Sequence, residues 1–168
     1  MAKKLPEWER LKLRIEPTPR NNWGDNLAHL LYKEIWDKLR REVYSRANHR
    51  CEICGQSFKV LHCHENWGFN EKKRSQFLVS LMSLCEDCHN TIHFFRTQNE
   101  AKAKRVPLKY LDQLQAHFIR VNDVDDNAWY RHLNSKSYVM QIRNDRHYSL
   151  DYREYSVAHI TRKYQDLG

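Results

Sequence analysis

The first third of the chain carries its longest stretch of regular hydrophobic spacing. Between residues 27 and 48 the apolar side chains recur at steps of three and four: Leu27, Leu30, Leu31, Ile35, Trp36, Leu39, Val43 and Ala47. This spacing places them on one face of a helix. Asp25 or Asn26 is suited to cap the helix, and a break near Lys33 would divide it in two. Residues 1–25, with three prolines and one glycine among charged residues, are expected to form an irregular arm.

The middle of the chain predicts a strand, a loop, a second strand and a helix. Residues 58–64 mix apolar and polar side chains over the length of a strand, and residues 77–84 form a second short apolar segment. Gly68 and Asn70, followed by a basic run, mark the loop between them. Residues 88–95 have helical spacing, with His89 and His93 four positions apart and therefore on one face.

The last third predicts further helices and a small hairpin. Pro107 is expected to open a helix that reaches about residue 121. Acidic residues at 123–126 suit the first turn of another helix, ending near residue 133. Residues 138–143 and 147–152 are predicted as two strands joined by a turn, and residues 154–164 as a short helix. The predicted fold class is therefore α+β, divided into the arm (1–25), a central unit with its leading helix (26–98) and a C-terminal segment (99–168) packed on that unit.

Composition and charge narrow the partners that this chain can have. Its 168 residues carry a formal net charge of +8, 30% of them are charged, and the mean hydropathy is -0.89. Several separate clusters of basic residues along the chain favour a polyanionic partner. The alternative is that these residues are ordinary solvated surface. No apolar run approaches the roughly 20 residues that span a bilayer, so no membrane partner is expected. The charged N-terminus and the cysteine spacing lead us to expect a cytoplasmic protein.

Four of the five cysteines form two C-x-x-C pairs, Cys51 with Cys54 and Cys85 with Cys88. Each pair can direct two sulfurs at the same ion, and two pairs complete a tetrahedron of thiolates. We therefore predict a structural zinc ion with four protein ligands. The alternatives are a redox dithiol or four buried thiols.

Four histidines lie in or just after the segment between the two cysteine pairs. His62 and His64 belong to the first predicted strand, while His89 and His93 can grip one metal ion from a helix. A third ligand from the strand would leave coordination positions open for water and phosphate. The alternative is that these histidines lie at the surface or support the zinc site.

These motifs together resemble the cysteine-bearing branch of the HNH endonucleases. The resemblance rests on Cys51-x-x-Cys54, on the sequence LHCHE at residues 61–65 and on LCEDCHNTIH at residues 84–93. It covers roughly residues 36–95. It implies a zinc-stapled ββα-metal (HNH) core with N-terminal helices and a C-terminal α/β appendage, which hydrolyses phosphodiester bonds of DNA with one divalent ion (Zn, Mn, Ni or Mg).

The resemblance also implies roles for individual residues. His64 corresponds to the general base that activates water, and Cys63, His89 and His93 correspond to ligands of the catalytic ion. The chain departs from the family pattern at two places. Cys63 replaces the usual aspartate or histidine, so that His62 or Glu65 is an alternative ligand, and Ser80 lies near the position of the usual asparagine.

Nucleic-acid contacts are predicted on the loop that follows the first strand. Lys72, Lys73 and Arg74 are candidate phosphate contacts, and Trp67 could stack on a base. A plain solvated loop is the alternative for the three cations. DNA is the expected partner, with RNA as a second possibility and the oligomeric state left open. The alternative function is a catalytically inactive zinc module that binds DNA or a protein partner.

Overall fold

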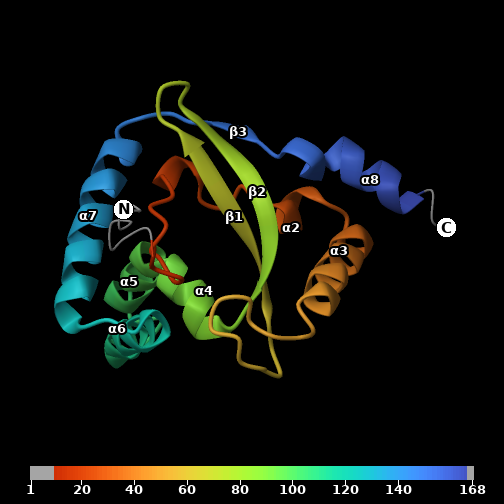
Figure 1. Ribbon diagram of the computed structural model, residues 1–168. Helices are drawn as coiled ribbons and strands as arrows, with labels where there is room; N and C mark the ends of the chain where they lie inside the picture. Colours follow the sequence, from red (N-terminus) through yellow and green to blue (C-terminus); the bar gives the residue numbers. More distant parts are fainter. Residues whose placement is uncertain (1–9, 166–168) are drawn as a thin grey trace, which may run out of the picture.

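A long antiparallel hairpin of β1 (His62–Asn70) and β2 (Ser75–Leu84) lies at the centre of the structure (Figure 1). The structure, a computed structural model, describes residues 10–165. The short strand β3 (Ser149–Asp151) pairs in parallel with β2, which gives the strand order β1-β2-β3. Seven α-helices accompany this sheet in the described part of the chain, and the predicted α+β class is confirmed.

The hairpin is longer at its tip than the sequence predicted. Its pairing runs from His62 opposite Leu84 to Asn70 opposite Ser75, with one irregularity between Asn66 and Trp67. Gly68 and Asn70 therefore belong to β1, and the loop is reduced to residues 71–74. A Cβ at Gly68 would lie 2.3 Å from the Phe77 ring, so glycine here permits the close cross-strand approach. Residues 58–61, predicted as strand, precede β1.

Helices α2 (Leu27–Leu30) and α3 (Lys33–Arg46) cover one face of the hairpin together with α8 (Val157–Gln165). The predicted break between the first two helices is confirmed. The Asn26 side chain caps α2 by accepting a hydrogen bond from the His29 N–H (3.1 Å). The buried core on this face consists of Leu27, Leu31, Leu39, Val43, Leu78, Leu81 and Ile160.

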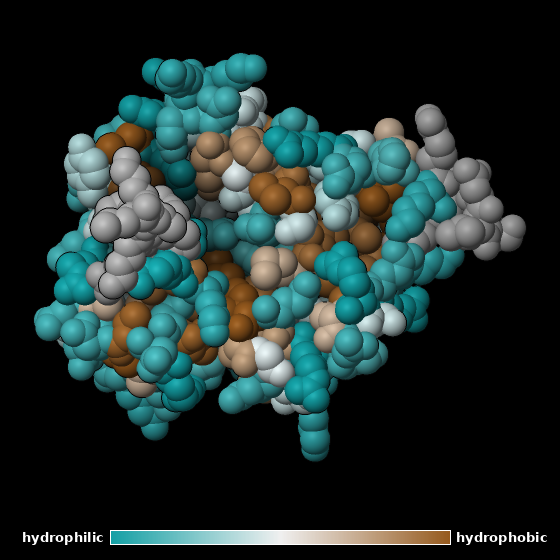
Figure 2. All heavy atoms as spheres, in the orientation of Figure 1, coloured by the Kyte–Doolittle hydropathy of each residue, from teal (hydrophilic) through white to brown (hydrophobic). Residues whose placement is uncertain are grey.

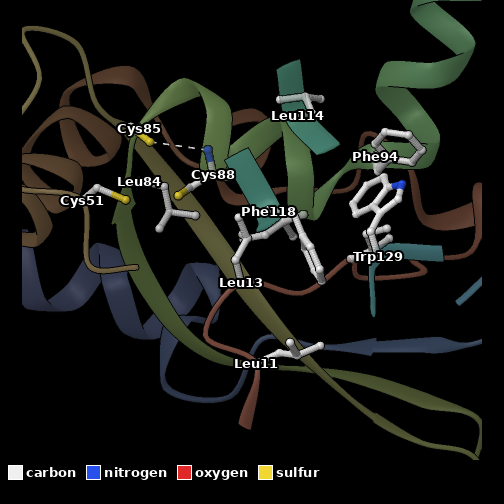
Figure 3. Close-up of a cluster of buried hydrophobic side chains, with 12 residues drawn as sticks. Leu11, Leu13, Cys51, Leu84, Cys85, Cys88, Phe94, Leu114, Phe118 and Trp129 are labelled. Carbon is white, nitrogen blue, oxygen red and sulfur yellow. Dashed lines mark hydrogen bonds between the residues drawn. The ribbon is translucent and has the colours of Figure 1, made fainter. Parts of the chain in front are cut away.

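Helices α4 (Glu86–Ile92), α5 (Phe94–Lys102), α6 (Lys109–Asn122) and α7 (Asp126–Asn144) lie on the other side of the hairpin (Figure 1). Figure 3 shows their core, in which Phe118 lies between Leu84 and Trp129, and Trp129 packs against Phe94 and Phe118. The C-terminal helices therefore share a core with the central cysteine-bearing unit. The face seen in Figure 2 is mostly hydrophilic, as expected from the charged composition.

The predicted hairpin at residues 138–152 is wrong. Residues 138–143 belong to α7, which continues without a break to Asn144, and β3 pairs with β2 instead. The local composition favours a strand, but no glycine or proline interrupts the helix. Its buried residues Trp129, His132 and Met140 share one face, so packing of that face decides the structure.

The described part of the N-terminal arm has no regular element apart from the short 3-10 helix η1 (Arg20–Asn22), and it is built into the core. Buried Leu11, Leu13 and Ile15 alternate with exposed Lys12 and Arg14, as in an extended segment with one face inward. Residues 1–9 of the predicted arm lie outside the described residues.

Three elements hold the arm through hydrogen bonds to its backbone. The Asn122 side chain of α6 accepts from the Leu13 N–H (3.0 Å) and donates to the Leu13 carbonyl (2.9 Å). The Ile15 N–H donates to His132 Nε2 on α7 (3.0 Å). The Glu16 N–H donates to the Ile92 carbonyl at the end of α4 (2.9 Å). The arm therefore joins α4, α6 and α7.

Shortening a core side chain of the arm should destabilise the whole fold. We expect Leu13→Ala to lower the free energy of unfolding by about 2–5 kcal/mol, because it leaves a cavity at a fully buried position. Lys12→Ala, at the exposed neighbouring position, should change it by less than about 0.5 kcal/mol. Urea denaturation measures both, and equal effects would contradict the packing described for the arm.

The contact between His132 and the arm predicts a pH dependence of stability. Burial lowers the pKa of His132 from 6.5 to about 4. Below pH 6.5 the unfolded chain takes up a proton there while the folded protein does not, so stability is lost as the pH falls from 6.5 towards 4. We expect His132→Gln, which keeps a hydrogen-bond acceptor, to lose less stability over this range than the wild type. The exposed variant His147→Gln should keep the wild-type slope in thermal unfolding.

Candidate metal centres

Four cysteines converge at the open end of the hairpin, where β2 ends and α4 begins. Cys51 and Cys54 lie on the loop after α3, and Cys85 and Cys88 lie at the end of β2 and the start of α4 (Figure 3). Their sulfurs all lie within 4.8 Å of one another. In the first pair the Gly55 N–H donates to the Cys51 carbonyl (2.9 Å), with a positive φ of 74° that suits glycine. In the second pair the Cys88 N–H donates to Cys85 Sγ (3.4 Å).

The spacing and ionisation of these sulfurs fit a bound cation. Two thiolates on one tetrahedral zinc ion lie roughly 3.8 Å apart, since each Zn–S bond is about 2.3 Å. The sulfurs of Cys54 and Cys85 are 3.9 Å apart. Hydrogen bonding with Cys51 raises the pKa of Cys85 to about 12 and also raises that of Cys88, while the same contacts lower the pKa of Cys51, so these thiols share their protons. The four cysteines could therefore hold a metal ion such as zinc, as the sequence predicted.

His117, on α6, supports this cluster and was not identified from the sequence. Its Nε2 lies 3.1 Å from Cys88 Sγ, and its Nδ1 lies 2.9 Å from Arg120 Nη2. Arginine only donates hydrogen bonds, so Nδ1 accepts and Nε2 carries the proton that is donated to the sulfur. Such a donor stabilises a metal-bound thiolate. The one available sequence signal is the i, i+3 spacing of His117 and Arg120.

A second cluster consists of three histidines: His64 on β1, His89 on α4 and His93 at the C-cap of α4, where α5 follows. One ligand nitrogen of each lies within 4.8 Å of those of the other two. The ring centroids of the three pairs are 4.7, 4.9 and 5.5 Å apart, with edge-to-face geometry. We call this group the histidine trio. The convergence expected from the sequence is present.

The electrostatics of the histidine trio suit a metal ion. Burial lowers the pKa of His89 to about 3 and that of His93 well below its usual value, so both rings are neutral and keep a lone pair. The His64 side chain is only 1% exposed, and its Nε2 has no hydrogen-bond partner among the described residues. Buried polar atoms without partners are rare in proteins, so this nitrogen requires a hydrogen-bond partner or a ligand.

Cys63 does not belong to the histidine trio, which corrects the predicted ligand set. Neighbouring residues of a strand point to opposite faces, and Cys63 packs with the core beneath α2 and α3. Burial raises the pKa of its thiol to about 12, which disfavours the thiolate that a metal ligand requires. The alternative candidate His62 stacks on the His89 ring, with centroids 4.9 Å apart. Glu65 is turned to the Cys63 face, where Oε1 accepts from the Leu27 N–H (2.7 Å).

Glu16, on the N-terminal arm, was missed by the sequence analysis. Its Oε2 lies 3.7 Å from His64 Nε2, and this buried oxygen has no hydrogen-bond partner among the described residues. Forty-eight residues separate the two side chains, and no motif connects them. Ser80, at the position expected for the family asparagine, accepts a hydrogen bond from Asn66 Nδ2 (3.3 Å).

A cavity of about 630 Å³ connects the histidine trio with α2 and α3. Its lining contains all three histidines, and aromatic and basic side chains from other elements add to it: Trp23, Trp36, Trp67, Arg40 and Arg96. Trp67 therefore lies at the cavity, where its ring also contacts Tyr152 (centroids 5.4 Å apart). The cavity has both the apolar surface and the cations that a nucleotide can contact.

The other three predicted nucleic-acid contacts lie away from the histidine trio. Lys72, Lys73 and Arg74 are exposed in the loop at the hairpin tip. Six residues of β1 separate His64 from the end of the strand, a distance of roughly 20 Å at 3.3 Å per residue. These cations can contact a ligand only if it extends along the hairpin.

Comparisons of the chain with protein-family models, with curated proteins and with solved structures find no match. Among the described residues, every helix is too short or too polar to cross a lipid bilayer.

The cysteine cluster predicts one tightly held zinc ion per chain. We expect elemental analysis of Cys51→Ala to show loss of this ion. The unfolding temperature of the variant should fall by roughly 10 °C or more, because structural zinc binding contributes folding free energy. Cys63→Ala is the matched control, because this cysteine lies outside the cluster, and it should keep its zinc. Equal zinc content in both variants would contradict the assignment.

Proposed function

We propose that the protein is a metal-dependent endonuclease that hydrolyses phosphodiester bonds of DNA. The observation that carries this proposal is the histidine trio, in which a strand and a helix bring three imidazoles together at a cavity. The trio matches the resemblance to HNH endonucleases at each of the three positions His64, His89 and His93. The positive net charge of +8 is consistent with a polyanionic substrate.

Each histidine has a distinct role in the proposal. His89 and His93, kept neutral by burial, would hold the divalent ion. The ion would supply positive charge at the scissile phosphate. His64 would act as general base and accept a proton from the attacking water, a function that imidazole suits because its usual pKa is near neutral.

The surroundings of the histidine trio provide contacts for the rest of the substrate. Arg40 and Arg96 line the same cavity and can bind phosphate oxygens, while Trp67 presents an aromatic ring to a base. The exposed cations Lys72, Lys73 and Arg74 would contact the backbone of a duplex that follows the hairpin. Single-stranded RNA could use the same contacts and is tested beside DNA.

One observation favours a second function, a non-catalytic zinc module. The His64 side chain is 1% exposed, so the proposed base is accessible only from the cavity. A protein of this kind would bind DNA or a protein partner, and the histidine trio would hold an ion that only stabilises the fold.

Cleavage of supercoiled plasmid distinguishes the two functions. We expect the wild type to nick the plasmid with at least one ion among Mg²⁺, Mn²⁺, Ni²⁺ and Zn²⁺. His64→Ala should lower the rate by roughly 100-fold or more, the usual effect of removing a general base. Cys63→Ala, on the opposite face of the same strand, should cut within about threefold of the wild type.

The controls decide what a negative result means. An intact plasmid with every ion, from a wild-type protein that carries its zinc, would support the binding module and refute the nuclease. Equal cleavage by wild type and His64→Ala would assign the activity to a contaminant. Faster cleavage of RNA than of DNA would keep the chemistry and change the substrate.

A further inference from the structure

The N-terminal arm brings one carboxylate to the histidine trio. Leu13 and Ile15 are buried, and their backbone groups bond to Asn122 and His132. The next residue, Glu16, is fixed by the hydrogen bond from its N–H to the Ile92 carbonyl, at the end of the helix that carries His89 and His93. The position of Glu16 relative to the histidine trio is therefore set by the same packing that builds the core.

Two buried atoms without partners face each other at this place. His64 Nε2 and Glu16 Oε2 are 3.7 Å apart, and neither has a hydrogen-bond partner among the described residues. The separation exceeds a normal N–H···O bond by about 0.7 Å, which a small side-chain rotation would close. The two atoms are complementary as donor and acceptor, because a neutral imidazole donates at one nitrogen and a carboxylate only accepts.

Other candidates for the partner of His64 Nε2 are engaged elsewhere. Ser80, at the position of the family asparagine, is bonded to Asn66. The Glu65 carboxylate is on the opposite face of β1 and accepts from Leu27. Among the described residues, Glu16 forms an ion pair with His64 alone.

We infer that Glu16 is the positioning residue of His64: its carboxylate accepts the Nε2 proton and thereby keeps Nδ1 unprotonated. A histidine whose second nitrogen donates to a carboxylate is fixed in one tautomer and one ring orientation, and its free nitrogen becomes more basic. This inference deepens the proposed function, on which its catalytic consequence rests. Its structural consequence, the tautomer of His64, can be measured without substrate.

The tautomer is read by long-range ¹H–¹⁵N NMR of the histidine rings in the full chain carrying one zinc ion. We expect His64 to be protonated at Nε2 in the wild type. Glu16→Ala removes the acceptor and should shift the ring to a tautomer mixture, whereas Glu16→Gln keeps an acceptor oxygen and should retain Nε2–H. Asp25→Asn removes a carboxylate that lines the same cavity and is exposed, and it should match the wild type.

Binding of a second ion gives an independent readout. Calorimetric titration of the same protein with Mn²⁺ or Zn²⁺ should show affinity reduced roughly 10-fold in Glu16→Ala, because a carboxylate 3.7 Å from His64 Nε2 offsets part of the positive charge of an ion held by the neighbouring His89 and His93. Glu16→Gln should lie between Glu16→Ala and the wild type, because it keeps the acceptor without the charge. If Glu16→Ala does not fold, Glu16→Gln alone tests the inference. An affinity of Glu16→Gln for the ion within twofold of that of the wild type would then overturn it.

Two results would overturn the role of Glu16 outright. One is an Nδ1–H tautomer of His64 in the wild type. The other is a folded Glu16→Ala that keeps both the Nε2–H tautomer and the wild-type affinity for the ion. A wild type that shows these Glu16-dependent properties but leaves DNA intact would instead refute the nuclease and keep the inference. DNA cleavage that is unaffected by Glu16→Ala would refute the inference and keep the nuclease.

Discussion

Four thiols packed within a few ångströms of one another form the constraint on which the rest of the structure depends. Their sulfurs cannot all ionise without a compensating cation. They come from two segments, the loop after α3 and the junction of β2 with α4, which hydrogen bonds between Glu52 and Ser83 also join. Cys85 is also the N-cap of α4, with its sulfur accepting from the Cys88 N–H. The geometry of the cluster therefore fixes where α4 begins, and with it the positions of His89 and His93 further along the helix.

The alternation of side chains along β1 divides the chemistry between the two faces of the hairpin. His62 and His64 contact α4, while Cys63 and Glu65 point to α2 and α3. Burial favours the neutral form in both groups, with opposite consequences for binding an ion. It keeps His89 neutral and able to bind an ion, whereas it keeps the Cys63 thiol protonated and raises the pKa of Glu65 to about 7. One strand thus presents a metal-binding face and a face that belongs to the core.

Sequence patterns predicted the parts of the structure that depend on local spacing. The break between α2 and α3, strand β2, each C-x-x-C pair and the pairing of His89 with His93 on one helical face follow from residues a few positions apart. The predictions failed where distant residues decide the outcome. Residues 138–143 have the composition of a strand but continue α7 because its inner face is buried against α6 and the arm. Glu16 and His117 reach their sites only through tertiary packing. Nothing in the neighbouring sequence marks Glu16, and the spacing of His117 and Arg120 alone does not point to the cysteines.

The charge balance of the histidine trio gives a physical reason to expect an anionic ligand there. Neutral imidazoles contribute no formal charge, so a divalent ion held by His89 and His93 would keep most of its positive charge. Arg96, which lines the cavity, adds to it, while the charge of Arg40 is paired with Asp37 in the same lining. The Glu16 carboxylate offsets one positive charge. Glu65, on the opposite face of β1, offsets little more, because burial raises its pKa to about 7. A phosphate group would neutralise the remainder, which is why the same arrangement that suits an ion also suits a phosphodiester.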